Sequence, residues 1–583
     1  MDRLPPELIA LIISFLNEDG NDNDTTTTNL AAYAPISRQY QVAVEHLTFR
    51  RLRVQSGAEQ LALFAERLLP RHRRAALAEI AFEVLLPAYS ADRAAKFERR
   101  REREANNAAF TEAVAALFRV LRGWEEEGEE LGKAGSGRGR GIALHLGAYA
   151  VADVERPRAL DEWRDLGAHR YGKSVLRLLD GEDGELMMQI PEVRRIVEFR
   201  TPGRSRCTRQ LRAASVARIA VAGMPNLGRV EWELDDCAFA EDEVRHRYRK
   251  DFADALSAVA SGRLTDFCLR LRLDDPQNDA FSVPSGTDPA AGVDALSVAL
   301  HDWLSAAPKL VSFTLDMSLS PSIFGPDAAL SPSSPSPSPS SSSSQQPPPI
   351  KYPHLRTARI TTGRTTAAGT WLYSADADDA QAVAAADAEE WEWHDPYDQS
   401  GYSSSACMTS WSSEELVDPD DSDWAETWHD WHDGLATGRR PRRHFRSRVD
   451  RGLLEGFLGA ASRAVMVREK GDMPRLERMV VQVGEEVGGD WQFGQGEAQE
   501  RQIYWECGVD DQLDTGDGDG DGGSGGMKKK ERKGKGKVVR VVTLPGAWNE
   551  DPRWKPSKEL REMWEGWVGE EGRVEVSLCE DNF

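Results

Sequence analysis

Cysteine is scarce in this sequence, and its arrangement argues against several kinds of site. The 583 residues include six cysteines, and no two of them form a C-x-x-C pair. A zinc ribbon or a redox-active dithiol is therefore not expected, and scattered single thiols suit a reducing compartment. Long hydrophobic runs are also missing, since no stretch of about 18 apolar residues occurs, so we predict no membrane span.

Positive charge is in short supply. Lys and Arg number 73 against 96 Asp and Glu, which gives a formal net charge of −23. A surface of this sign repels phosphate backbones, so we expect no general binding to nucleic acid. The N-terminus carries Asp2 and Glu7 where a secretory signal would be basic. We therefore expect an intracellular protein, in the cytoplasm, the nucleus or both.

Motifs that carry chemistry are incomplete. Asp517, Asp519 and Asp521 match the first half of an EF-hand loop, but Lys528 stands where the loop needs a bidentate Glu. No H-E-x-x-H sequence is present. We predict no catalytic residue, no metal site and no cofactor, and a protein that is not itself an enzyme.

The first segment predicts a short helix over residues 4–16. Pro5 and Pro6 suit the first turn, where a missing N–H costs nothing, and Glu7 favours the positive helix start. Apolar side chains cover most of the helix surface: Leu8, Ile9, Leu11, Ile12, Ile13, Phe15 and Leu16. Such a helix must bury two faces, and its own domain covers only one of them.

A second helical stretch is expected over residues 30–54, broken by Pro35. Together the two segments resemble an F-box, a three-helix module that docks on the Skp adaptor of a cullin-RING ubiquitin ligase. By position, the resemblance implies adaptor-binding residues Leu4, Pro5, Leu8, Ile9, Ile12 and Leu16. It implies a module core of Ile36, Tyr40, Val44 and Phe49, with Tyr40 where the family often has Trp.

The resemblance extends along the chain to F-box proteins of the filamentous-fungal type. Those proteins carry a leucine-rich-like α/β body and a C-terminal domain of unknown function, which residues 445–508 resemble.

A repeated motif marks the body. Pro-x-Leu followed by alternating apolar residues begins at 225, 308, 353 and 474, and a version without the proline includes Arg263 and Leu264. The alternation predicts strands with one buried face. Helical stretches precede three of them, at 208–223, 242–262 and 293–306. Further strands are expected near 80–84, 142–146, 503–507, 538–544 and 574–578.

Helices that alternate with strands favour an α/β fold with an open parallel sheet. We expect F-box-like helices followed by an irregular, leucine-rich-repeat-like helix–strand solenoid with disordered insertions; a compact α/β sandwich is the main alternative. The expected parts are as follows: an F-box-like module at 1–54, a repeat body at 55–317, a disordered Ser/Pro-rich insertion at 318–350, a repeat strand at 351–373, an acidic Trp-rich insertion at 374–444, and a C-terminal α/β domain at 445–583 with a disordered insert at 510–537.

These observations lead to one expected function and two alternatives. The first is a substrate-recognition subunit of an SCF-type ubiquitin ligase, whose partners would be a Skp-type adaptor, a cullin scaffold and an unknown protein substrate. The second is an interaction scaffold without a ubiquitin role. A hydrolase with an unrecognised site is the third, and no feature of the sequence favours it.

Overall fold

The computed structural model divides into two compact units, Met1–Glu233 and Leu234–Phe583. It describes residues 5, 7–9, 11–13, 30–90, 98–130, 141–154, 170–171, 174–179, 190–202, 209–236, 242–272, 276, 279–325, 352–374, 446, 448–466, 475–483, 503–509, 537–543, 555–568 and 573–578.

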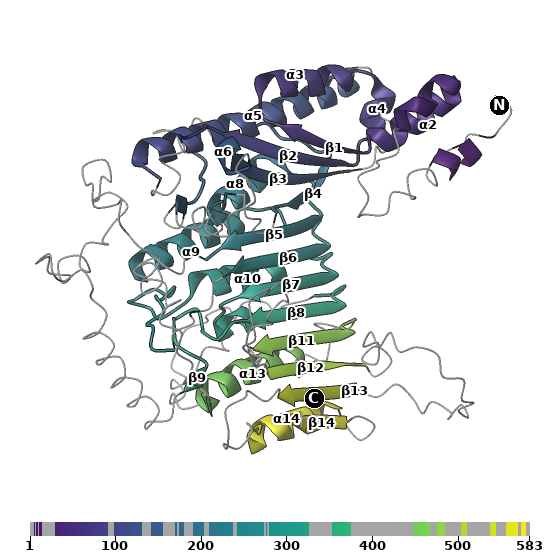
Figure 1. The fold of residues 1–583 in the computed structure, drawn as a ribbon. Helices are drawn as coiled ribbons and strands as arrows, with labels where there is room; N and C mark the ends of the chain where they lie inside the picture. The colour runs from purple at the N-terminus through teal and green to yellow at the C-terminus, as the bar shows by residue number, and fades with distance from the viewer. Residues whose placement is uncertain are drawn as a thin grey trace, which may run out of the picture. The chain divides into compact units, whose positions relative to one another are not determined.

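The fold is α/β and is built on a mostly parallel, 12-stranded sheet (Figure 1). Its strands are hydrogen-bonded in chain order: β1 (Arg51–Gln55), β2 (Glu79–Leu86), β3 (Ile142–Ala150), β4 (Ile196–Arg200), β5 (Arg229–Asp235), β6 (Asp266–Arg272), β7 (Ser312–Met317), β8 (Thr357–Thr362), β11 (Arg478–Val483), β12 (Ile503–Val509), β13 (Lys537–Thr543) and β14 (Arg573–Leu578). Every strand expected from the sequence is present. β12 runs antiparallel to both of its neighbours, which the expected parallel sheet did not include.

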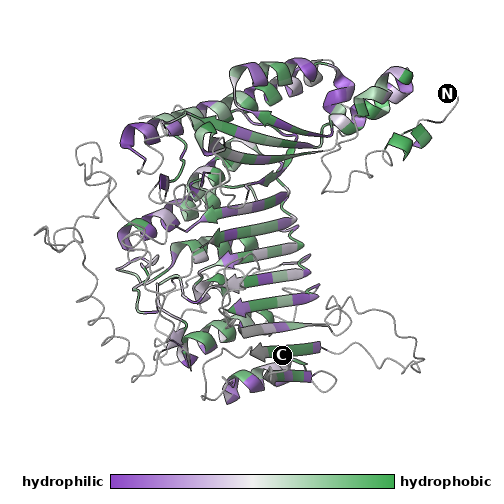
Figure 2. Cartoon of the chain, in the orientation of Figure 1, coloured by the Kyte–Doolittle hydropathy of each residue, from purple (hydrophilic) through white to green (hydrophobic). Residues whose placement is uncertain are grey.

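In the first unit, β2 and β3 each bury every second side chain. Side chains of β3 alternate between buried and half-buried positions, and Ile142, Leu144 and Leu146 are among the buried ones. Figure 2 shows this mixture of apolar and polar residues along the strands. The helices of this unit are α2 (Arg38–Thr48), α3 (Ala58–Arg67), α4 (Arg71–Ala76), α5 (Arg100–Glu130), α6 (Val151–Val154) and α8 (Ala213–Gly223), after the 3-10 helix η1 (Leu30–Ile36). The long helix α5 packs on β2.

The second unit continues the alternation of helix and strand. Its helices are α9 (Asp242–Ser257), α10 (Ala295–Ser305), α13 (Arg451–Met466) and α14 (Lys558–Val568), together with the 3-10 helix η4 (Pro321–Phe324). A separate two-stranded antiparallel pair joins β9 (Tyr373–Ser374) to β10 (Arg448–Val449). The expected helices at 208–223, 242–262 and 293–306 are confirmed as α8, α9 and α10.

The Pro-x-Leu motif forms one recurring turn at the start of the strands. The amide of Leu310 donates to the carbonyl oxygen of Ala307 at 3.3 Å, and that of Leu355 donates to Tyr352 at 3.4 Å. Leu264, in the version without proline, makes the same bond to Ser261 at 3.1 Å. All three leucines are buried. Proline suits the second position of such a turn because its φ angle is already fixed there.

The structure differs from the sequence expectations at three places. Residues 51–55 form β1 rather than the end of a helix, because Leu52 and Val54 pair with β2. β4 was not expected. Ser318–Gly325, assigned to a disordered insertion, contains η4, whose Phe324 ring stacks edge-on against Phe457 at 5.3 Å. The rest of that insertion, most of the acidic Trp-rich insertion and nearly all of 510–537 lie outside the described residues.

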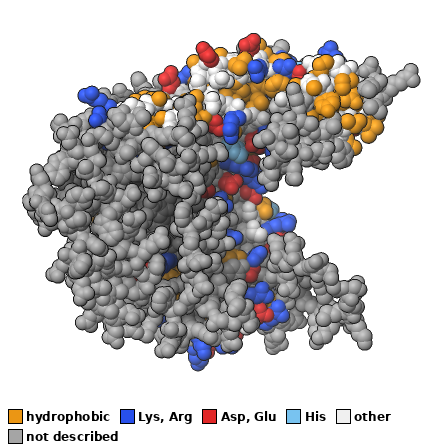
Figure 3. Space-filling view, in the orientation of Figure 1, with side chains coloured by type: hydrophobic (Ala, Val, Ile, Leu, Met, Phe, Trp, Pro, Cys, Tyr) orange, Lys and Arg blue, Asp and Glu red, His pale blue; other side chains and the backbone are white. Residues whose placement is uncertain are grey.

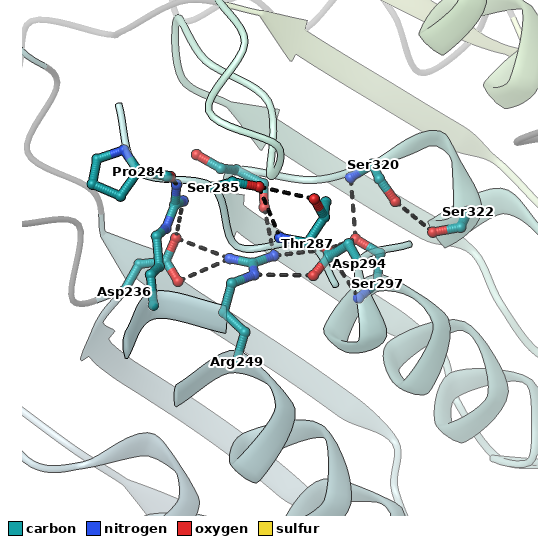
Figure 4. Close-up of polar contacts among 11 residues, drawn as sticks. Asp236, Arg249, Pro284, Ser285, Thr287, Asp294, Ser297, Ser320 and Ser322 are labelled. Carbon is teal, nitrogen blue, oxygen red and sulfur yellow. Dashed lines mark hydrogen bonds and ion pairs between the residues drawn. The ribbon is translucent and has the colours of Figure 1, made fainter. Parts of the chain in front are cut away.

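A buried ionic network connects the loops that follow the strands of the second unit (Figure 4). Arg249 on α9 donates to Asp236, directly after β5, at 2.8 Å and to Asp294, the N-cap of α10, at 2.8 Å. It also donates to the carbonyl oxygen of Ser318, after β7, at 3.0 Å. Burial opposes the ionisation of Asp294, but the charge of Arg249 outweighs it and keeps the pKa of Asp294 below its usual value.

We expect Arg249→Gln to destabilise the chain by about 3–5 kcal/mol, because buried Asp294 loses its cation and buried Asp236 keeps only Arg245. Arg356→Gln is the matched control, since Arg356 forms an exposed pair with Glu477 at 3.5 Å whose loss costs about 1 kcal/mol or less. Urea unfolding of the full-length chain, followed by circular dichroism, measures both. Equal losses in the two variants would contradict the assigned role of the network.

Candidate functional site

The first helix of the chain follows Pro5, which lies at its amino end as expected. The amides of Leu8 and Ile9 donate to the carbonyl oxygen of Pro5 at 3.0 and 3.2 Å, and residues 7–9 and 11–13 are helical. Proline is favourable at this end of a helix, because its ring fixes φ and the missing N–H has no acceptor there.

One face of this helix forms the core of a small helical module. Ile9 and Ile13, four residues apart, are 0% exposed and pack with Tyr40 and Val44 of α2. Partly buried apolar residues surround this core: Leu30, Tyr33, Ala34, Ala43 and Leu47. Ser37 caps α2 by accepting a hydrogen bond from the amide of Tyr40 at 3.3 Å. The helix is therefore anchored to the rest of the module on this side.

The opposite side of the same helix is exposed and apolar. Leu8, Leu11 and Ile12 are 46%, 50% and 38% exposed. We call these three residues the N-terminal apolar face. Figure 3 shows hydrophobic side chains gathered at this end of the first unit. Water-exposed apolar side chains are common singly, but a group on one helix face marks an interaction surface.

This end of the chain holds an unusual share of exposed apolar residues. Five of the nine large apolar side chains that are exposed in the described part of the chain lie between residues 8 and 42. The set consists of Leu8, Leu11, Ile12, Ile36, Val42, Leu69, Val197, Val221 and Val293. The sequence expectation of a helix with two apolar faces therefore agrees with this placement.

The adaptor-binding residues expected from the F-box resemblance differ in their exposure. Pro5, Leu8 and Ile12 are exposed, whereas Ile9 is buried in the module's own core, because it lies one position round the helix from Leu8. Leu4 and Leu16 lie outside the described residues.

The expected core residues differ from the structure at one position. Tyr40 and Val44 are buried and Phe49 is half-buried, but Ile36 is 45% exposed because it ends η1, before α2 turns its apolar side inward.

A nearly buried carboxylate ties α2 to α4. Glu45 accepts hydrogen bonds from Arg73 Nη2 at 2.8 Å and from Gln41 at 2.9 Å, and His72 Nε2 lies 2.6 Å away. The guanidinium of Arg73 also lies 4.8 Å from the centre of the Phe49 ring. This contact was not expected from the sequence, where the available signal is the acid Glu45 on the apolar side of α2.

The hydrogen bond from Arg73 is the largest cause that lowers the pKa of Glu45 to about 2; Gln41 and His72 add to it, and burial opposes it. The carboxylate is therefore ionised at any physiological pH and holds α2 against α4 as a charged partner.

Other clusters of ionisable residues are closed to reactants. In the first unit, Arg209 donates to Glu98 at 3.0 Å, and both side chains are almost fully buried. In the second unit, Asp236 and Asp294 have arginine partners and are equally buried. Among the described residues, no group of three His, Cys, Asp or Glu side chains is placed to hold a metal ion, and no helix is long and apolar enough to cross a membrane.

Comparisons with known proteins give no match. No protein-family model, no curated protein and no solved structure matches this chain. The candidate site therefore rests on the geometry of the N-terminal apolar face alone.

We expect Glu45→Gln to lower the stability of the first unit near pH 7 by about 1–3 kcal/mol, because Arg73 loses a charged acceptor. The folded-state pKa of Glu45 lies near 2, below its ordinary value of 4.5. Its contribution is therefore complete above about pH 5 and is lost as the pH falls toward 2. Urea unfolding of both proteins from pH 7 to pH 3 measures the difference, which should shrink in acid. A difference in the free energy of unfolding that stays constant from pH 7 to pH 3 would show that the charge of Glu45 does not stabilise the fold.

Proposed function

We propose that this protein is the substrate-recognition subunit of an SCF-type ubiquitin ligase. The observation that carries the proposal is the N-terminal apolar face, an exposed apolar side of a helix whose other side is anchored by Ile9 and Ile13. The resemblance of this segment to an F-box supplies the partner, a Skp-type adaptor that links the chain to a cullin scaffold.

Burial of apolar surface would supply the affinity for the adaptor. A large aliphatic side chain contributes about 1.5–3 kcal/mol when it is fully buried. Leu8, Leu11 and Ile12 are about half exposed, so a second protein has a substantial area left to cover. The helix is already held in place by its own module, which reduces the ordering cost of binding.

The helix–strand body would hold the target protein. From β1 to β11 its strands are parallel neighbours in chain order, and several of them bury every second side chain; both features support an irregular, leucine-rich-repeat-like solenoid. In this role the chain performs no chemistry. It raises the local concentration of the target near the catalytic subunits, which turns an encounter between two molecules into an effectively intramolecular step.

We expect the double variant Leu8→Asp, Ile12→Asp to lose adaptor binding by about 100-fold or more, since two apolar contacts become buried charges. The matched control is Val221→Asp on α8, where a valine as exposed as Ile12 is replaced. Binding of the full-length chains to a purified Skp-type adaptor, by calorimetry, measures the effect. Circular dichroism of each variant checks that the helix content is unchanged and that the module built on Ile9 and Ile13 still folds.

Two outcomes would argue against the proposal. If the unmodified chain does not bind the adaptor, the ligase role fails and an interaction scaffold without a ubiquitin role becomes the better assignment. If Val221→Asp weakens binding as much as the double variant does, the N-terminal apolar face is not the docking surface.

A further inference from the structure

The recurring turns of the second unit place one side chain each at the same exposed position. Before β6, β7 and β8 the residue that precedes the turn's leucine is exposed, while Leu264, Leu310 and Leu355 are buried. A basic residue type stands at this position before each of β6, β7, β8 and β11: Arg263, Lys309, His354 and Arg475. We call these residues the basic row, and all four are exposed.

The turns that carry the basic row are immediate neighbours in space. The amide of Val311 donates to Thr265 at 2.7 Å, that of Arg356 to Val311 at 2.8 Å, and that of Glu477 to Arg356 at 2.8 Å. The strands that follow, β6, β7, β8 and β11, are parallel neighbours whose amino ends meet at one edge of the sheet (Figure 1). Arg475 Nη1 lies 3.2 Å from His354 Nδ1.

Stability does not account for the basic row. Arg263 and Lys309 stand on neighbouring turns, and like charges on neighbouring strands repel each other and are destabilising. Opposite charges face each other two residues further along the chain. There, Arg356 pairs at 3.5 Å with Glu477 of the neighbouring turn. On the adjacent strands, Arg478 pairs with Glu506 and Arg540 with Glu575. No acidic side chain is within ion-pair distance of Arg263, Lys309 or Arg475 in the described structure.

We propose that the basic row is a binding surface for an acidic peptide segment of a partner protein. Only the identification of this partner as the ligase's target rests on the proposed function. Neighbouring strands lie about 4.8 Å apart, so the row spans roughly 14 Å, the length of four or five residues of an extended peptide.

An acidic peptide fits better than a nucleic acid. The net charge of −23 repels a long polyanion, whose charge extends far beyond the row. A short acidic segment senses mainly the local cations, because charges farther away than about 8 Å are screened at physiological salt. Arg475 donates to His354 Nδ1 at 3.2 Å, so this histidine adds a polar contact to the row.

The test uses the full-length chain and a fluorescein-labelled hexaglutamate peptide at low salt, with binding read by fluorescence anisotropy. The triple variant Arg263→Gln, Lys309→Gln, Arg475→Gln should bind about tenfold more weakly, and added salt should weaken binding to the unmodified chain. The control is Arg451→Gln, Lys558→Gln, Arg561→Gln, which removes the same charge from α13 and α14. Thermal melting of all three proteins confirms that they fold.

Any one of three other outcomes would overturn the proposal. Equal weakening in both triple variants would mean that net charge alone attracts the peptide. Tighter binding of a six-nucleotide oligothymidine, with the same dependence on the basic row, would make the surface a phosphate-backbone site. No binding of hexaglutamate to the unmodified chain would remove the acidic-peptide site while leaving adaptor binding by the N-terminal apolar face untouched.

Discussion

Alternate burial along parallel strands is the constraint on which both units depend. In β2, β3, β5, β7 and β8 every second side chain is buried, and in β3 all the buried positions are almost fully excluded from water. Apolar burial of this kind supplies most of the free energy of folding. It also fixes the register of each strand, since a shift by one residue would bring the polar set inward. The turns and loops at the strand ends are therefore held at regular positions.

Regular positions bring single side chains together in space although they are 45 residues or more apart in sequence. At the amino ends of β6, β7 and β8, each turn buries its leucine and exposes the residue before it, and the exposed Arg475 before β11 completes the basic row. At the carboxyl ends, the loops carry buried polar groups that need partners, and Arg249 satisfies three of them at once. The same repeat thus produces the exposed basic row at the amino ends of the strands and a buried ionic network at their carboxyl ends.

The sequence predicted the strands far better than the site. Period-2 alternation after Pro-x-Leu located β5 to β8 and β11, because the motif reports burial directly. β1 was taken for helix, since Arg51–Gln55 is short and follows a true helix without a break. For the N-terminal apolar face, helical spacing indicated two faces but could not decide which one the module covers. That choice depends on the packing of Ile9 against Tyr40, a contact between segments about 30 residues apart. The link from Glu45 to Arg73 likewise joins separate elements and leaves no local pattern.

The two proposed surfaces differ in chemistry, and the difference fits what each would have to bind. An apolar helix face gains affinity from area and shape, which suits one partner of constant structure. A row of exposed cations gains little from each contact but accelerates encounter and tolerates variation in the bound sequence. A chain that joins a constant partner to changing ones would need both kinds. The buried ion pairs of Arg209 and Arg249 serve neither purpose, since their charges are already neutralised inside the protein. The outward-facing residues, rather than the most ionised clusters, are therefore where the function of this protein is to be sought.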